Sequence, residues 1–149
     1  MVEALPDATV HRMRHYRKDR LLQMMQELDI PTLLIYDPVS IRYATDSRNV
    51  QVYALNHECR YLFMAADGTT ELFDWVAGHD AYHGHLDTID AVHVARPVGF
   101  MSDGADNFDT SLREWADQIE SLIRRTSPDD LRVGIDRLSH FQATELERR

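Results

Sequence analysis

Three histidines lie close together in the sequence, at positions 79, 83 and 85. His79 and His83 are four residues apart, so on a helix they would share one face and could bind zinc. Gly84, however, is unfavourable inside a helix, and the glutamate of a His-Glu-x-x-His zinc site does not follow His79. We therefore expect a polar loop here and no metal site. A stand-alone metal-binding domain that uses His79, His83 and His85 is the alternative hypothesis.

The other candidate reactive groups do not form a complete active site. Asp103, Asp106 and Asp109 recur at every third position, whereas a calcium loop needs ligands at alternate positions. Cys59 lies two residues after His57, so on a strand the two side chains would share a face and could form a thiol–imidazole pair. A single cysteine at the start of an apolar strand is more typical of a small buried side chain. Since nucleophile-elbow and phosphate-loop motifs are absent from the sequence, we predict no catalytic residue in this chain.

The composition excludes several classes of protein. The 149 residues include 25 acidic and 16 basic side chains, and the resulting net charge of -9 disfavours nucleic-acid and anionic-membrane partners. No apolar run approaches the roughly 20 residues of a membrane span, and residues 1–7 lack the basic and apolar regions of a secretion signal. The single cysteine suits a reducing compartment. We expect one cytoplasmic domain over residues 1–149.

Apolar side chains at helical spacing predict two long helices, over residues 11–29 and 109–125. The stripe of the first helix, expected to face the core, consists of Met13, Tyr16, Leu21, Met24, Met25 and Leu28. The stripe of the second helix consists of Leu112, Trp115, Ile119, Leu122 and Ile123. One or two helical turns are predicted over residues 39–45. A last helix is predicted after Ser139, which has capping-box spacing to Gln142.

Short apolar segments between these helices predict the strands. They cover residues 32–36, 59–65, 71–75, 91–95 and 131–135. Asp67 and Gly68 separate the second and third segments and predict a tight hairpin between them. Helices otherwise alternate with strands. The sequence therefore predicts an α/β fold, a mixed β-sheet with flanking helices.

The segment after the first predicted strand carries a distinctive motif. Residues 37–49 read D-P-x-x-I-R-Y-A-T-x-S-R-N, with Tyr36 before them and with His57-Glu58-Cys59-Arg60-Tyr61 and Ala66-Asp67-Gly68 after them. This pattern resembles the N-terminal domain of the creatinase, prolidase and Xaa-Pro aminopeptidase family, the pita-bread metallohydrolases. The motif is most similar to a bacterial branch that includes dimethylsulfoniopropionate lyases. Because the resemblance covers nearly the whole chain, it implies a fold of the creatinase/prolidase N-terminal domain type.

The resemblance also implies where the chemistry of such a protein lies. In this family a separate C-terminal domain binds two divalent metal ions through two Asp, one His and two Glu, and these ions activate water or polarise the substrate. No residue here can be matched to those five ligands, since the chain ends about where the connection to the catalytic domain would begin. The resemblance therefore implies a domain that holds no cofactor and is not an enzyme alone, with a catalytic pita-bread domain as its partner. The full-length family members are metal-dependent hydrolases or lyases.

The N-terminal domain of relatives lies over the active site of the partner subunit in a dimer, and some of its side chains reach the substrate. The resemblance makes His57 and Arg60 candidates for substrate contact, with Arg48 and Asn49 as outer candidates. Arg60 could hold a substrate carboxylate through a two-pronged hydrogen bond. Local structure is the alternative role: Arg48 could bond loop carbonyls, and His57 could cap a strand.

The resemblance thus implies a homodimer that contributes assembly and gating of the partner's active site. The substrate is a small molecule or a peptide, and proline peptides, creatine-like amidines and sulfonium zwitterions all remain open. A dimerising binding module without the catalytic part is a further alternative. The coding sequence after Arg149 separates that module from a fragment of a longer protein.

Overall fold

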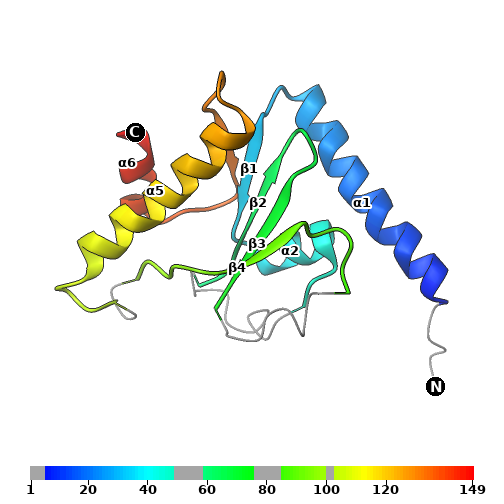
Figure 1. Ribbon diagram of the computed structural model, residues 1–149, viewed down its shortest axis with the longest axis horizontal. Helices are drawn as coiled ribbons and strands as arrows, with labels where there is room; N and C mark the ends of the chain where they lie inside the picture. The colour runs from blue at the N-terminus through cyan, green and yellow to red at the C-terminus, as the bar shows by residue number, and fades with distance from the viewer. Residues whose placement is uncertain (1–5, 49–58, 76–84, 100–102) are drawn as a thin grey trace.

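The computed structural model describes residues 6–48, 59–75, 85–99 and 103–149, which form one sheet with helices on both faces (Figure 1). The helices are α1 (Asp7–Glu27), α2 (Pro38–Thr45), α5 (Phe108–Thr126) and α6 (His140–Glu147). The strands are β1 (Thr32–Ile35), β2 (Tyr61–Ala65), β3 (Thr70–Asp74), β4 (Ala91–Val94) and β5 (Val133–Ile135). These elements confirm the predicted α/β class. In the described part of the chain, no helix combines the length and apolar character needed to cross a membrane.

The sheet is mixed, with the strand order β4-β3-β2-β1-β5. The three central strands pair antiparallel, and the two outer strands run parallel to their neighbours. Asp67 and Gly68 turn the chain between β2 and β3, so the predicted hairpin is confirmed. Gly68 has a φ of 99°, a left-handed conformation that a side chain would strain.

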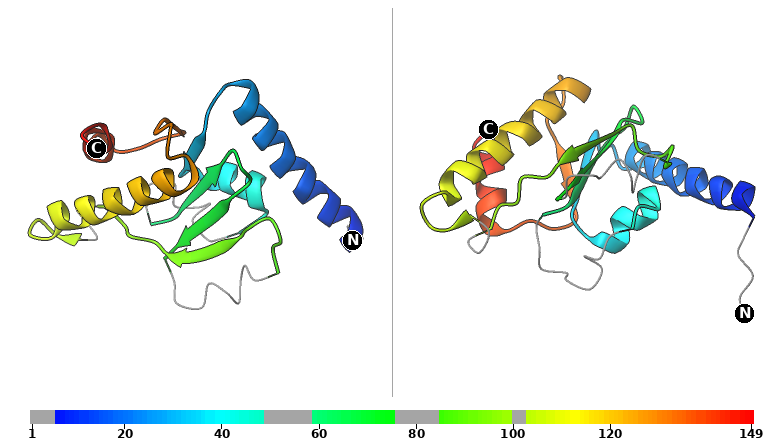
Figure 2. Two further views of the ribbon diagram at one scale, coloured as in Figure 1. Left: turned by 45° about the horizontal axis from the view of Figure 1, so that its top comes forward. Right: turned by 60° about the horizontal axis from the view of Figure 1, so that its bottom comes forward.

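One face of the sheet carries α5 and α6 over the larger apolar core (Figure 2). The predicted stripe of α5 is confirmed, because all five of its residues are buried. The largest of them, Trp115, donates a 2.8 Å hydrogen bond from its indole Nε1 to the Oη of Tyr36. Gln142 of α6 is also buried and donates to the same oxygen at 3.3 Å. Ser139 and Gln142 form the predicted capping box, which fixes the start of α6 beside α5.

The opposite face carries α2 and the C-terminal part of α1 over a smaller core (Figure 2). Ile41 and Ala44 of α2 belong to this core together with Met25 of α1 and with Leu62 and Leu72 of the hairpin. All residues of β2 are buried, because its alternating side chains enter both cores. The central hairpin therefore forms the middle layer of the fold.

The first helix forms, over Asp7–Glu27, and its predicted apolar stripe is divided: Leu21 and Met25 lie against the smaller core, whereas the other four residues are exposed. Tyr16 and Leu28 are 63% and 60% exposed, and Met13 and Met24 are 38% and 40% exposed. Met25 is the buried residue of this helix. Figure 1 shows the reason: α1 diverges from the sheet toward its N-terminal end, so only its last turns lie over the core. We call Met13, Tyr16, Met24 and Leu28 the outer stripe of α1.

Polar contacts hold the first half of α1 to the rest of the fold. Nε of Arg14 donates a 2.9 Å hydrogen bond to Oδ2 of Asp46, just after α2. Nζ of Lys18 donates to the carbonyl of Thr88 at 3.2 Å and lies 3.7 Å from Oδ2 of Asp90. The partners of both cations come from loops rather than from the sheet. The inward face of α1 is thus charged at one end and apolar at the other.

Candidate functional site

Arg60 is buried at the start of the central hairpin. Its side chain is 2% exposed, its Nε lies 3.1 Å from Oδ2 of Asp74, and its Nη2 donates a hydrogen bond to Oγ of Ser47. Burial lowers the pKa of the guanidinium, and the charge of Asp74 acts in the opposite direction. A two-pronged clamp on a substrate carboxylate would require Arg60 to leave these partners. The geometry favours an anchoring role, and direct substrate contact by Arg60 stays a prediction.

The motif around α2 explains why Arg60 contacts the segment that follows this helix, residues 46–48. Oδ2 of Asp37 accepts a 2.7 Å hydrogen bond from the backbone N–H of Ser40 and caps α2. The helix ends at Thr45, and Asp46 follows it in a left-handed conformation with a φ of 62°. The buried members of the motif are Pro38, Ile41, Ala44, Thr45 and Ser47. The motif is therefore largely structural, and it fixes residues 46–48 beside Arg60.

The other predicted substrate contacts lie at the border of the described residues. Arg48 is exposed, one residue after the serine that Arg60 binds. Asn49 and His57 fall outside the described residues, so contact between them and a substrate stays a prediction. Cys59 is half-buried in the segment that leads into β2. Arg60 thus binds the segment that carries Arg48, and the side chain of Arg48 remains accessible to solvent.

The structure brings together a group of potential metal ligands that the sequence analysis missed. Nε2 of His11 and Nε2 of His15 lie 2.7 Å and 3.0 Å from the same oxygen, Oδ2 of Asp87. The signal for the histidine pair was present in the sequence, because the two lie four residues apart on the predicted first helix. Asp87 comes from the segment before β4, and spacing along the chain could not have added it. We call these three residues the α1 histidine cluster.

The histidines predicted as an alternative metal site are described only in part. His79 and His83 fall outside the described residues, while His85 is exposed. His85 is not part of the α1 histidine cluster, although it lies only two residues before Asp87. A zinc site on His79, His83 and His85 therefore stays an untested alternative.

Two further buried titratable groups have structural partners. Glu71 of β3 lies 2.8 Å from Nε2 of His93 on β4, and it also pairs with Arg125 at the end of α5. Tyr61 donates a 2.7 Å hydrogen bond from its hydroxyl to Oε1 of Gln118. Burial raises the pKa of the Tyr61 phenol. Glu71 thus links β3 to α5 through Arg125, and Tyr61 links β2 to α5 through Gln118.

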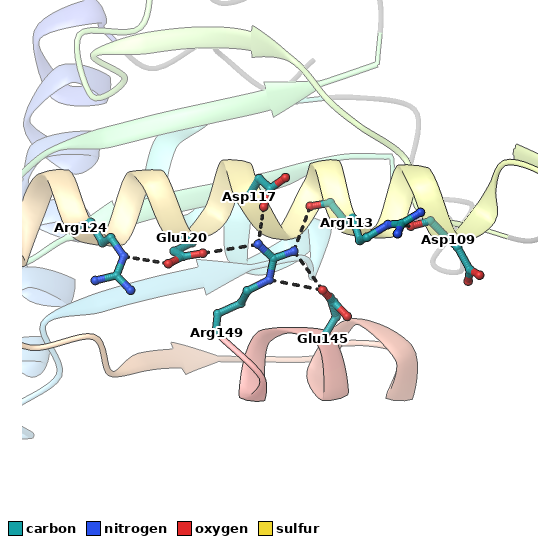
Figure 3. A network of polar contacts seen from close by, with 7 residues as sticks. All are labelled: Asp109, Arg113, Asp117, Glu120, Arg124, Glu145 and Arg149. Atoms are coloured by element: carbon teal, nitrogen blue, oxygen red, sulfur yellow. Dashed lines mark hydrogen bonds and ion pairs between the residues drawn. The ribbon is translucent and has the colours of Figure 1, made fainter.

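Arg149 connects the last helix to α5 (Figure 3). Its guanidinium lies between Asp117 and Glu120 of α5 and Glu145 of α6, and Nη2 donates to Oε1 of Glu145 at 2.9 Å. These pairs lie at the surface, so each contributes little to stability by itself. The network sets the position of α6 against α5 rather than forming a reactive site.

Two curated proteins with the same name are similar to this chain in sequence. The chain is 30% identical over 147 residues to dimethylsulfoniopropionate lyase DddP from Roseovarius nubinhibens, a match that covers 97% of this chain and 31% of that protein. It is 28% identical over 134 residues to the protein of the same name from Roseobacter denitrificans, covering 90% of this chain and 29% of that protein. The chain thus spans about a third of the length of these curated relatives. No family model matches it.

A solved structure has the same fold. The crystal structure of an Xaa-Pro aminopeptidase from Streptococcus pyogenes superposes with a TM-score of 0.60 at 15% sequence identity. The match covers 91% of this chain and 87% of the solved chain, so the two chains are of similar length. This chain is related to the N-terminal domain of the creatinase, prolidase and Xaa-Pro aminopeptidase family. The predicted relationship and fold type are therefore confirmed.

The metal ligands of this family's catalytic domain do not fit the residues described here. The family's pair of ions needs two Asp, one His and two Glu. In the described parts of the chain, the group of convergent ligands is the α1 histidine cluster, with two His and one Asp. That set is too small for two ions and has the wrong composition.

Proposed function

We propose that this chain is the non-catalytic N-terminal domain of a metal-dependent hydrolase or lyase of the creatinase and prolidase family. One observation carries the proposal: the similarity to DddP extends over 97% of this chain but over only 31% of that protein. The remaining two thirds of such a protein have room for a catalytic pita-bread domain. In this proposal the two divalent metal ions belong to that other domain.

The first proposed role of the domain is assembly of a homodimer. The outer stripe of α1 supports it, because this stripe exposes four large apolar side chains along one helix. With 3.6 residues per turn, the four positions fall within an arc of about 120°. Arg20 and Glu27 fall within the same arc, so this side of the helix offers apolar side chains together with charges of both signs. We propose that a second copy of the chain covers it.

The second proposed role is gating of the active site in the partner subunit. Arg48 is exposed beside a loop that Arg60 and Ser47 hold in place. We propose that Arg48, Asn49 and His57 approach the substrate and that Arg60 positions their segment. A rigidly held loop with an accessible cation suits the recognition of an anionic group, such as the carboxylate of a zwitterion or a peptide.

The proposed substrate class follows the relatives' name. Both curated relatives are named dimethylsulfoniopropionate lyases. A sulfonium zwitterion with a carboxylate is therefore our first candidate substrate for the full protein, and a peptide with proline in second position is the next. We propose a cytoplasmic location, in keeping with the single cysteine of the sequence.

The coding sequence that follows the codon for Arg149 tests the proposal. We expect it to continue in frame with two Asp, one His and two Glu at the spacing of the family's catalytic domain. A stop codon there would overturn the two-domain proposal and favour a dimerising binding module.

An activity assay on the purified 149-residue chain adds a second test. We expect no release of dimethyl sulfide from dimethylsulfoniopropionate and no cleavage of Xaa-Pro dipeptides, with Mn²⁺, Fe²⁺ or Zn²⁺ supplied. Metal-dependent turnover of either substrate by this chain alone would contradict a non-catalytic role.

A further inference from the structure

The α1 histidine cluster joins two segments that are far apart in the sequence. His11 and His15 lie one helical turn apart on α1, and their ring centroids are 4.4 Å from each other. Their Nε2 atoms both approach Oδ2 of Asp87, at 2.7 Å and 3.0 Å. One potential ligand atom from each residue lies within 4.8 Å of the other two. Two imidazoles and a carboxylate that converge in this way resemble the ligand set of a divalent transition-metal ion.

Neighbouring contacts hold both segments of the cluster in place. On the side of Asp87, Leu86 and Thr88 are buried, and Oγ1 of Thr88 donates a 2.8 Å hydrogen bond to the carbonyl of Thr45. Oδ2 of Asp90 accepts a 2.7 Å hydrogen bond from the backbone of Thr70. The turn that presents Asp87 is thus fastened on both sides to the core. A ligand set supported in this way loses little freedom when it binds an ion.

The cations beside the cluster already have partners of their own. Lys18 lies between the carbonyl of Thr88 and the carboxylate of Asp90, and Arg14 pairs with Asp46. Their charges are thus offset by acidic or carbonyl oxygens, which weakens their repulsion of a bound cation.

We propose that His11, His15 and Asp87 form a binding site for one divalent transition-metal ion, with Zn²⁺ as the preferred occupant. Water completes the coordination, since the three side chains are partly exposed. Zinc suits this set because it takes imidazole and carboxylate ligands in a tetrahedron. This site is separate from the family's catalytic metals, and it does not depend on the proposed function of the domain.

Metal binding requires only a small rearrangement of the cluster. Bonds of 2.0–2.1 Å in a tetrahedron separate neighbouring ligand atoms by about 3.3 Å. The two nitrogen-to-oxygen distances are 2.7 Å and 3.0 Å, so the carboxylate must withdraw by a few tenths of an ångström. Both imidazoles must carry their proton on Nδ1, which leaves Nε2 free to bind the ion. Rotation of the exposed side chains opens the ligand distances. An imidazole that donates to Asp87 through Nε2 must first move that proton to Nδ1 or release it to solvent, so binding weakens as the pH falls.

The consequence of binding is a metal link between α1 and the segment before β4. The first half of α1 lies away from the apolar core, and its inward contacts are polar. An ion held by two α1 residues and one loop residue would fasten this half of the helix to the body of the domain. Binding to the folded state stabilises it by mass action. The proposed role of the ion is therefore structural.

Calorimetric titration of the metal-stripped 149-residue chain with ZnCl₂ tests the site. We expect one equivalent of Zn²⁺ to bind. Each of the variants His11→Ala, His15→Ala and Asp87→Asn should weaken the affinity at least about tenfold. The matched control is His79→Ala/His83→Ala, which removes the other histidine pair at four-residue spacing and should leave the affinity unchanged.

Hydrogen exchange locates the effect on the structure. Zn²⁺ should slow amide exchange in the first half of α1 in the wild-type chain and in the control variant, but not in His15→Ala. Absence of stoichiometric binding would overturn the proposal. Binding that survives the His11, His15 and Asp87 variants, or that disappears in the control variant, would also overturn it.

Discussion

The two long helices of this domain differ in what covers their apolar stripes. In α5, every residue of the predicted stripe is buried against the sheet. In α1, the outer stripe of Met13, Tyr16, Met24 and Leu28 remains at the surface, and the inward face contacts loops through His11, Arg14, His15 and Lys18. Both helices show helical periodicity in the sequence, but α5 buries its whole stripe, whereas α1 places only Leu21 and Met25 of its stripe against the core.

The comparison shows what an apolar stripe on a helix does and does not predict. A stripe indicates that some surface excludes water from that face. It does not say whether that surface belongs to the same domain. α5 packs over the sheet with its C-terminal part while its N-terminal end extends beyond the strands, whereas α1 approaches the sheet through its last turns (Figure 2). The exposure of the outer stripe of α1 is the observation on which the proposed dimer rests.

The largest loss of stability is expected from a substitution in the buried stripe of α5. Trp115→Ala should lower the free energy of unfolding by about 3–5 kcal/mol, because it opens a cavity in the main core and removes a donor from Tyr36. Urea denaturation followed by circular dichroism measures this loss. A loss below about 1 kcal/mol would mean that α5 is not the main packing helix.

A smaller loss of stability is expected from the buried face of α1, and it distinguishes that face from the exposed one. Met25 is 2% exposed and its neighbour Met24 is 40% exposed. Met25→Ala should destabilise the monomer by about 2–3 kcal/mol, since it removes a buried side chain from the smaller core. Met24 belongs to the outer stripe that the proposed dimer covers, so both variants are compared at protein concentrations low enough for the chain to be monomeric. Under that condition Met24→Ala is the matched control and should change the free energy of unfolding by less than about 0.5 kcal/mol. Equal losses in both variants, measured by urea denaturation, would refute the assignment of inner and outer faces.

The smallest effect is expected from the polar contacts of α1 without metal. The pKa of Asp87 is lowered in the folded state, so its contribution to stability is present above the ordinary carboxyl pKa and is lost as the pH falls through the folded value. Because the contacts of Asp87 with His11 and His15 are exposed, Asp87→Asn should lower the free energy of unfolding by at most about 0.5 kcal/mol at neutral pH. Thermal denaturation in EDTA should show this difference disappearing in acid. A difference that persists or grows in acid would contradict this role of the carboxylate.

Much of the fold could be predicted from local patterns. Gly68 signalled the hairpin, the Ser139–Gln142 pair signalled the start of α6, and the spacing of Trp115 and Ile119 signalled the buried face of α5. Each of these features depends on neighbours in sequence. The buried face of α1 could not be predicted in this way, because it depends on where α1 leaves the sheet.

The candidate sites depend on contacts between distant residues, and the sequence indicated them less well. Arg60 was singled out through a family resemblance, but its burial between Ser47 and Asp74 follows only from the packing of α2 against the hairpin. Asp87 joins His11 and His15 across more than seventy residues. Spacing identifies ligands on one element, whereas a third ligand from another element requires the tertiary structure.

The molar mass of the chain in solution tests the central claim, that a second copy covers the outer stripe of α1. Light scattering after size-exclusion chromatography should give twice the 17.3 kDa of one chain for the wild type. The double variant Tyr16→Lys/Leu28→Lys should give the mass of a single chain, with an unchanged circular dichroism spectrum. A monomeric wild type, or a dimer that survives this variant, would contradict the account.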